Sequence, residues 1–310
     1  MNRPRLGVDV GGTKIEIAAL DTDGKFLLRK RVATPKTDYD ATVETIGELV
    51  AAAEDELGTH CTVGFSIPGT ISPATGLIKN AFNSPLNDHP FDQDLEKLLK
   101  RPIKMVNDAN CFAVSEAKDG AAAGAAVVFG VIIGTGCGGG LVIDGKPVTG
   151  TNAIAGEWGH NPLPWPRPDE IPGLQGTDGK FGTIETFLSG TGFEAQHEAA
   201  FGNRISAEEI VANAGKGDGD CKRSLEDYVD RMARALSTVI NMLDPEIIVL
   251  GGGLSNITEL YEAVPARWAG WVFSDRVDTK LVPPKFGDSS GVRGAAWLWD
   301  NKEDKIDDEC

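Results

Sequence analysis

A pattern of strand, glycine turn, strand and hairpin occurs twice in this chain. The first copy spans residues 6–32 and reads LGVDV, GGTK, IEIAAL, DTDG and KFLLRKRV. The second copy spans residues 127–146 and reads VVFGVIIG, TGCGGG, LVI and DGK. Apolar runs separated by glycine-containing turns are typical of β-hairpins. The repetition predicts two related α/β halves that face each other across a cleft, where small-molecule sites are common.

The remaining pattern alternates helices, strands and one long loop. Apolar residues at helical spacing predict a helix over 41–57 and a longer amphipathic helix over 223–243. Strands are predicted at 61–67 and at 246–250, where a run of three glycines follows. Five prolines between residues 162 and 182 predict a long loop.

The chain is strongly acidic. Its 310 residues include 30 basic and 46 acidic side chains, which gives a net charge of −16 and a sequence pI of about 4.7. A field of this sign repels nucleic-acid backbones and anionic bilayers, so no nucleic-acid or membrane partner is expected. An anionic ligand must then be held locally, by backbone amides, a helix end or a metal cation.

Cysteine usage and the N-terminus predict a reduced, cytoplasmic protein. The five cysteines are odd in number, scattered and without a CxxC pair. The first residues, MNRPRLGVDVGG, lack the continuous apolar core of a signal peptide. Residues 120–143 carry no charge, but eight of them are glycine, which disfavours a membrane-spanning helix. We expect turns and strands of a soluble core in that segment.

The two glycine turns are candidates for binding phosphate. Glycine leaves backbone amides open to a ligand, and the first turn adds the hydroxyl of Thr13, the ammonium of Lys14 and the carboxylate of Asp9. This set suits polyphosphate, with Asp9 facing Mg²⁺ directly or through water. An ordinary hairpin explains either turn alone, whereas two turns at matching places favour phosphate. A dinucleotide fingerprint is excluded because no helix follows GxGxxG at 134–139, and a P-loop is excluded because no GxxxxGK[ST] occurs.

Two groups of polar residues could carry chemistry. Asp108 follows an apolar strand and precedes a helix-compatible run, where the helix dipole favours a carboxylate that can accept a hydroxyl proton. A helix cap is the simpler alternative for that aspartate. Glu157, His160 and Glu185 stand among glycines and apolar residues and suit a polyhydroxylated ligand. Solvated carboxylates and a buried histidine explain these three residues equally well.

Eight motifs, taken in order along nearly the whole chain, make the sequence similar to the ROK family of sugar kinases and repressors, and within it to bacterial fructokinases. They are DVGGTK (9–14), SIPGTISPATGLIKNAFNSPLN (66–87), NDANCFAVSEAKDGAAAG (107–124), IIGTGCGGG (132–140), GEWGHNPLPW (156–165), IETFLSGTGF (184–193), IIVLGGGLSN (247–256) and GDSSGVRGAAWLW (287–299). The resemblance implies a two-lobed, actin-like and hexokinase-type α/β fold with an interlobe cleft. Residues 1–107 and 294–310 would form the N-terminal lobe, and residues 108–293 the C-terminal lobe. Related proteins also suggest a homodimer.

The resemblance implies phosphorylation of a hexose with ATP and Mg²⁺, and in the fructokinases the conversion of fructose to fructose 6-phosphate. Asp108 would be the general base. The sugar would contact Gly69, Asn83, Asn107, Glu157, His160 and Glu185. The phosphates would bind at Gly11, Gly12, Thr13 and Lys14 and at Gly134, Thr135 and Gly136, and adenosine would lie against Gly251, Gly252 and Gly253.

The stretch before Glu185 departs from the family pattern. Zinc-binding members carry CxCGxxGC there, whereas this chain has Gly176, Asp178 and Thr183 at the three cysteine positions. A structural zinc needs about four ligands, and His160 with Asp178 offers two, so no structural zinc is expected.

Other hexoses and one non-enzymatic role are the alternatives. Kinases for glucose, mannose, N-acetylglucosamine or N-acetylmannosamine share related motifs and would differ near the altered stretch. DNA-binding members of the family carry an N-terminal helix-turn-helix domain. Such a domain is not expected here, because the first glycine turn begins at residue 11 and the net charge is unsuited to DNA.

Overall fold

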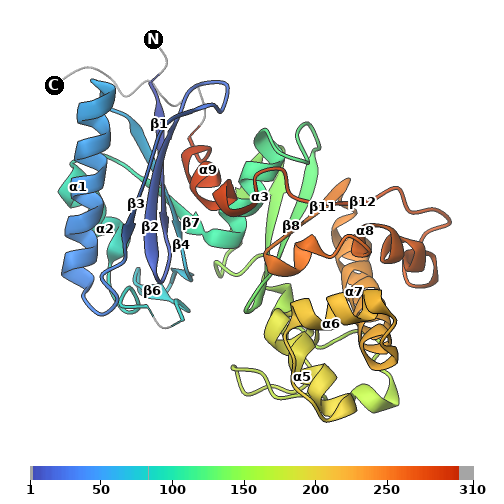
Figure 1. Ribbon diagram of the computed structural model, residues 1–310. Helices are drawn as coiled ribbons and strands as arrows, with labels where there is room; N and C mark the ends of the chain where they lie inside the picture. Colours follow the sequence, from blue (N-terminus) through green and yellow to red (C-terminus); the bar gives the residue numbers. More distant parts are fainter. Residues whose placement is uncertain (1–2, 83, 300–310) are drawn as a thin grey trace. The chain divides into compact units, whose positions relative to one another are not determined.

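The computed structural model describes residues 3–82 and 84–299, which form two compact α/β units (Figure 1). The second unit comprises Gly124–Gly140 and Gly156–Gly287, and the first comprises the other described residues. The predicted lobe boundary fell after residue 107, whereas contacts group residues 108–123 and 141–155 with the first unit. The assignment of lobes therefore stays a proposal.

The first unit contains a five-stranded sheet in the order β3-β2-β1-β4-β7. Its strands are β1 (Arg5–Val10), β2 (Lys14–Leu20), β3 (Phe26–Ala33), β4 (Thr62–Ile67) and β7 (Lys104–Asn107). Strands β1, β2 and β3 pair antiparallel, as the predicted hairpins require, and β4 and β7 add in parallel. A separate two-stranded ribbon joins β5 (Thr70–Ile71) to β6 (Ile78–Lys79).

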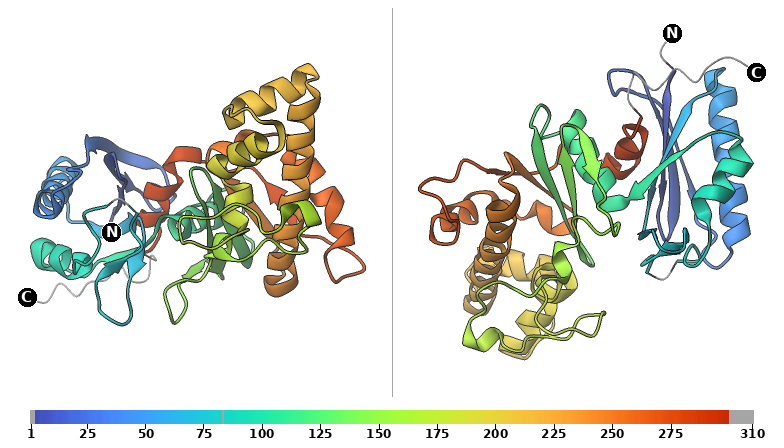
Figure 2. Two further views of the ribbon diagram at one scale, coloured as in Figure 1. Left: turned by 90° about the horizontal axis from the view of Figure 1, so that it is seen from below. Right: turned by 180° about the vertical axis from the view of Figure 1, so that it is seen from behind.

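Helices cover both faces of the first sheet. Helices α1 (Tyr39–Leu57) and α2 (Phe91–Leu99) lie on one face, and α9 (Ser290–Ala296) lies on the other (Figures 1 and 2). Helix α3 (Asp108–Lys118) packs against α9. Helix α1 buries Ile46, Leu49, Val50 and Ala53, whose spacing places them on one side of the helix. The predicted helix over 41–57 is thereby confirmed.

Two glycines in the strands allow α9 to lie directly on the sheet. A Cβ at Gly7 would lie 1.9 Å from the carbonyl oxygen of Val292, and one at Gly64 would lie 1.9 Å from that of Ala295. Gly7→Ala is therefore expected to lower the free energy of unfolding by about 1–3 kcal/mol, measured by urea unfolding. Gly270→Ala is the control, because a Cβ there meets no atom within 4 Å. Equal unfolding midpoints for the two variants would contradict the close approach.

The second sheet has the order β10-β9-β8-β11-β12. Its strands are β8 (Val127–Ile133), β9 (Cys137–Ile143), β10 (Lys146–Val148), β11 (Ile247–Gly251) and β12 (Lys280–Val282), and the division between the units passes through β9. Strands β9 and β10 form an antiparallel hairpin, while β11 pairs in parallel with β8 and β12. The order repeats that of the first sheet, which confirms the predicted duplication.

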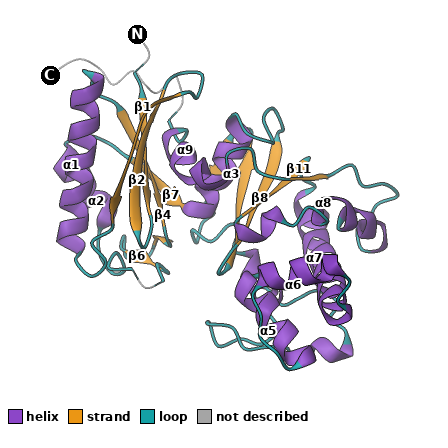
Figure 3. Ribbon diagram, viewed as in Figure 1, coloured by secondary structure: helices purple, strands orange, loops and turns teal. Residues whose placement is uncertain are grey.

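The rest of the second unit is mainly helical. Figure 3 shows α5 (Gly190–Phe201), α6 (Ala207–Lys216) and α7 (Gly219–Leu243) grouped together. The shorter elements are η1 (Trp158–His160), η2 (Pro168–Glu170), α4 (Ile184–Leu188), η3 (Gly253–Asn256), α8 (Leu260–Ala263) and η4 (Pro265–Gly270), while η5 (Gly287–Ser289) leads into α9. Helix α7 confirms the predicted amphipathic segment and buries Val229, Met232, Leu236 and Ile240. The proline-rich segment is a loop, as predicted, apart from the single turn η2.

Two sequence expectations concern the chain's environment. Strands β8 and β9 occupy much of the uncharged segment 120–143, and no helix in the described part of the chain combines the length and apolarity that a bilayer span needs. The cysteines in the described ranges, Cys61, Cys111, Cys137 and Cys221, are buried free thiols. Cys310 lies outside those ranges.

Candidate active site

The first glycine turn joins β1 to β2 and is held by Thr34, the residue that follows β3. The hydroxyl of Thr34 donates to the carbonyl oxygen of Gly11 at 2.7 Å, and its amide donates to that of Thr13 at 3.1 Å. Gly12 has no positive φ, and a Cβ there would meet no atom within 4 Å. Neither the backbone nor packing therefore requires glycine at residue 12. The open space above it suits a bound group that needs close access to the amides.

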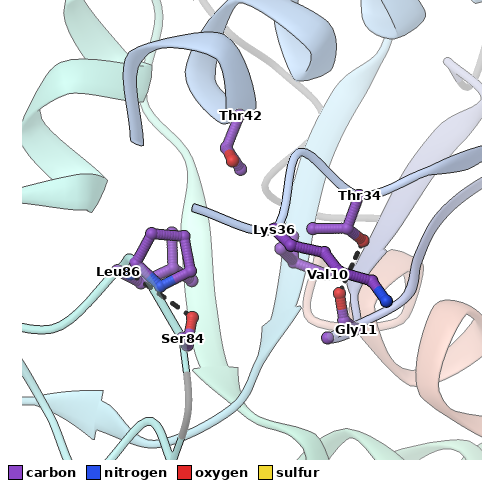
Figure 4. A pocket seen from close by; sticks show the side chains of 9 residues that line it. Val10, Gly11, Thr34, Lys36, Thr42, Ser84 and Leu86 are labelled. Atoms are coloured by element: carbon purple, nitrogen blue, oxygen red, sulfur yellow. Dashed lines mark hydrogen bonds between the residues drawn. The ribbon is translucent and has the colours of Figure 1, made fainter. Parts of the chain in front are cut away.

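A small cavity of about 120 Å³ lies beside this turn (Figure 4). Gly11, Gly12, Lys36, Ser84 and Leu86 are among the residues that line it, and Figure 4 shows Gly11 and Lys36 across from Ser84 and Leu86. Among the described residues, the Lys36 side chain has no hydrogen-bond or ion-pair partner, so its ammonium is available to an anion. Sequence reasoning did not single out Lys36, because it lies outside the glycine motif.

The second glycine turn joins β8 to β9 and is held by the start of α5. The amide of Gly190 donates to the carbonyl oxygen of Gly134 at 2.7 Å, and the hydroxyl of Thr191 donates to that of Thr135 at 2.9 Å. The carboxylate of Glu185, on α4, accepts from the amide of Cys137 at 3.0 Å. The fold thus brings Glu185, predicted from the sequence to bind sugar, into contact with a turn predicted to bind phosphate.

Asp9 lies in β1 next to β4, and the hydroxyl of Ser66 donates to its Oδ1 at 2.6 Å. Burial raises the pKa of the Asp9 carboxyl above its ordinary value of 3.8, although the bond from Ser66 acts in the opposite direction. A desolvated carboxylate gains from a nearby cation. Mg²⁺ is commonly held by one or two carboxylates, water and substrate phosphates, so Asp9 beside a turn that is predicted to bind phosphate fits this ion.

The raised pKa of Asp9 predicts a conflict between stability and activity. The folded state holds this proton more tightly than the unfolded state, so stability falls as the pH rises through the raised pKa. Asp9→Asn is expected to raise the Tm at neutral pH, with the difference from wild type vanishing below the ordinary carboxyl pKa. The same variant should lower kcat/KM by about 10- to 100-fold. Calorimetry at several pH values and an ADP-release assay test both expectations, and a lower Tm at neutral pH would contradict the first.

Asn107, Asp108 and Gly69 lie together in the first unit. Asn107 is the cap of α3, where its Oδ1 accepts from the amide of Ala109 at 2.9 Å and its Nδ2 donates to the carbonyl oxygen of Gly69 at 3.2 Å. Asp108 is the first residue of the helix and is exposed, with Oδ1 2.8 Å from the amide of Ala109. The predicted junction of strand and helix is confirmed, and Asn107 takes the cap position. Asn83 lies outside the described residues.

A larger cavity of about 420 Å³ in the first unit reaches Asn107. Its wall combines apolar side chains such as Ile71 and Met105 with the polar Asn110 and Thr151. Cavities of about 300–1,000 Å³ with a few polar groups in a mostly apolar wall are typical of small-molecule sites.

His160 and Glu157 are neighbours at η1 in the second unit. His160 Nε2 lies 3.6 Å from Glu157 Oε2, and His160 Nδ1 lies 3.5 Å from Asp178 Oδ2. The side chains of His160 and Glu157 are 44% and 42% exposed, so the alternative of a buried histidine is wrong. A bond from the amide of Lys180, with the nearby His160 and Lys180 side chains, holds the pKa of Asp178 below its ordinary value. Asp178 thus orients His160, which the sequence did not indicate.

The donor set at this place does not suit a structural zinc. Gly176 and Thr183 offer no thiolate. The carboxylate of Asp178 already interacts with His160 and with the ammonium of Lys180, a cation at this place. Within residues 3–82 and 84–299, no three His, Cys, Asp or Glu side chains gather as a metal site. The expected lack of a structural zinc stays a prediction.

Gly251 ends β11, and the two glycines that follow it differ in whether the backbone requires glycine there. Gly252 has a φ of 80°, and a Cβ there would lie 2.4 Å from the carbonyl oxygen of Ile133. Gly253 starts η3, and a Cβ there would meet no atom within 4 Å. The backbone therefore requires glycine at 252, while the open face at 253 suits a flat ligand. The adenosine role of this segment stays a prediction.

A sequence profile of the ROK family matches residues 5–302. The chain belongs to the ROK family. Relatives include the N-acetyl-D-glucosamine kinases of Pasteurella multocida and Vibrio cholerae, each 40% identical. The alignments cover 96% and 94% of this chain and 100% and 98% of the relatives. The resemblance to ROK sugar kinases inferred from the motifs is thereby confirmed.

Solved structures support the same fold. The ROK hexokinase from Thermus thermophilus is 29% identical with a TM-score of 0.84, covering 95% of this chain and 97% of its own. A ROK family glucokinase from Streptomyces griseus in complex with glucose and AMPPNP is 27% identical with a TM-score of 0.74, covering 95% and 98%. The predicted fold class, the actin-like α/β fold of hexokinases, is confirmed.

Proposed function

We propose that this ROK kinase transfers the γ-phosphoryl group of ATP to N-acetyl-D-glucosamine. Eight curated N-acetyl-D-glucosamine kinases, 36–40% identical over 94–96% of this chain, carry the proposal. These relatives favour N-acetylglucosamine, which the sequence analysis named as an alternative, over fructose. Fructose is the second candidate, because the eight motifs taken together resemble those of the bacterial fructokinases.

The proposed chemistry is the transfer of a phosphoryl group to the 6-hydroxyl group of the sugar. Asp108 accepts the proton of the 6-hydroxyl group, the freed oxygen bonds to the γ-phosphorus, and the bond to the β-phosphate oxygen breaks to release ADP. Amides of the two glycine turns stabilise the phosphate charge. Mg²⁺, when bound near Asp9, neutralises further negative charge on the phosphates. Glu157, His160 and Glu185 hold the other sugar hydroxyls.

The cavity that reaches Asn107 supports an N-acetylated sugar. An acetamido group has an apolar methyl group and an amide that needs hydrogen-bond partners. The wall of this cavity offers both kinds of surface, with Ile71 and Met105 for the methyl group and Thr151 or Asn110 for the amide. Fructose has no apolar substituent that would gain from the same wall.

Comparing kcat/KM across a hexose panel tests the substrate. ADP release is measured with N-acetylglucosamine, N-acetylmannosamine, fructose, glucose and mannose at fixed ATP and Mg²⁺. We expect N-acetylglucosamine to exceed the others by at least about tenfold. A preference for fructose would overturn the proposed substrate but leave the kinase chemistry in place. Failure of every hexose to release ADP would overturn both.

A further inference from the structure

A buried carboxylate anchors the long loop of the second unit to helix α7. Glu170, at the end of η2, is 1% exposed in its side chain. Its Oε1 accepts from Arg231 Nε at 2.8 Å and from Arg234 Nη2 at 2.7 Å. Its Oε2 accepts from the amide of Arg167 at 2.7 Å. Both carboxylate oxygens are therefore satisfied by donors from the loop and from α7.

Arg234 connects this carboxylate to a second point of the loop. Its side chain is 1% exposed, and its Nη1 donates to the carbonyl oxygens of Pro164 and Trp165 at 3.1 and 2.9 Å. Its Nε donates to Asp230 at 2.9 Å. Trp165 has a φ of 46°, in the left-handed region that bulky residues rarely adopt. The guanidinium thus holds a strained piece of backbone that the chain would not keep unaided.

Both ends of the anchored loop carry candidate sugar-binding residues. His160 lies four residues before Pro164, and the loop returns through a β-bridge between Pro162 and Thr183. The amide of Ile184 closes this base by donating to the carbonyl oxygen of Asn161 at 2.8 Å. Glu185 follows directly, on α4. A displacement of the loop base would therefore move His160 and Glu185 together.

The charge state of the anchor favours a fixed geometry. Burial raises the pKa of Glu170, but the bonds from Arg234, the Arg167 amide and Arg231 outweigh it and hold this pKa below its ordinary value. Glu170 is therefore ionised at neutral pH. Replacing a buried ion pair by apolar residues of similar volume is often neutral for stability. Stability alone therefore does not account for this cluster. Its hydrogen bonds fix the loop at Pro164, Trp165 and Arg167, which points to a role in positioning the loop.

We propose that Arg234, together with Glu170, is a positioning residue that sets the places of His160 and Glu185 for the sugar. This role rests on the proposed hexose site. It needs no metal ion, in agreement with the residues around Asp178, which do not suit a structural zinc. We expect a larger effect on the sugar than on ATP, because His160 and Glu185 both belong to the predicted sugar contacts, whereas only Glu185 also contacts the second glycine turn.

Separate Michaelis constants for the sugar and for ATP test the role of Arg234. Arg234→Met is expected to lower kcat/KM for the preferred hexose by about 10- to 100-fold, with the KM for ATP within about twofold of wild type. The double variant Glu170→Leu, Arg234→Met removes both charges of the buried Glu170–Arg234 pair and leaves the less deeply buried Arg231 without its contact to Glu170. It should regain part of the lost Tm while keeping the raised sugar KM. It also keeps the test valid if the single variant does not fold. Arg223→Met is the control, since Arg223 lies exposed on the same helix and, among the described residues, its one ion pair is with Asp227.

Three outcomes decide the matter. A sugar KM that stays raised in the double variant while the Tm is partly regained supports positioning. A double variant with wild-type Tm and wild-type sugar KM would overturn it, as would equal increases in the KM for sugar and for ATP. His160→Ala is measured in parallel: an unchanged sugar KM in that variant would show that the proposed sugar site itself fails, independently of the anchor.

Discussion

Asp108→Asn is expected to lower kcat by about 10²- to 10⁴-fold, the usual contribution of a general base. The amide keeps the shape of the side chain and can still accept a bond from the Ala109 amide, so the start of α3 should not change. The loss would therefore report proton transfer and not folding. Steady-state ADP release with the preferred hexose gives kcat, and sugar binding by calorimetry should stay within a few-fold of wild type.

A matched exposed aspartate controls for the change of charge. Asp23, in the hairpin turn between β2 and β3, is exposed and has no predicted role in the reaction. Asp23→Asn should keep wild-type kcat and sugar affinity. If Asp108→Asn retains more than about a tenth of the wild-type kcat, the assignment of the general base is wrong.

Gly12→Leu is expected to lower kcat/KM for ATP by about 10²- to 10³-fold, the range seen when donors to a developing charge are lost. The side chain would occupy the open space above the first turn, where the phosphates are proposed to lie. Because a Cβ at Gly12 meets no protein atom within 4 Å and the residue has no positive φ, the Tm should stay near the wild-type value. Thermal unfolding and ATP titration separate the two effects.

Gly270→Leu supplies the comparison. Gly270 also has open space around its Cβ position and no positive φ, but it lies at the end of η4, away from any glycine turn of the motifs. It should change neither Tm nor KM. Equal activity of Gly12→Leu and Gly270→Leu would show that the first turn does not bind ATP.

The helical parts of the site could be predicted because their signals are local. The junction at Asp108 was readable from an apolar strand that runs into a helix-compatible segment, and α7 was readable from its apolar spacing. Arg234 left no such signal, because it lies on the opposite side of the helix from the apolar stripe, where a charged residue is expected. Its partner could not be inferred, because Glu170 lies on a loop 64 residues earlier in the chain.

The loop geometry lay beyond sequence reasoning. The family resemblance placed Asp178 and His160 in one region, as the remaining ligand types of a zinc motif, but it did not indicate a direct contact between them. That contact depends on where the turn at 176–180 folds back. The sequence also did not decide whether His160 is exposed, because a buried histidine and a ligand-binding histidine explained the residue pattern equally well. Loop conformation depends on bonds between distant residues, which no local pattern specifies.

By itself, the amino-acid sequence determined the duplicated hairpin sheets, the family and the residue types available for phosphate and hydroxyl groups. These follow from strand, turn and helix preferences that act over a few residues. Only the tertiary structure decided that Glu185 rests on the second glycine turn, that Asp178 orients His160, and that Arg234 holds both Glu170 and the backbone at Trp165. Each of these is a contact between segments far apart in the chain, whose closeness arises only when the whole unit packs.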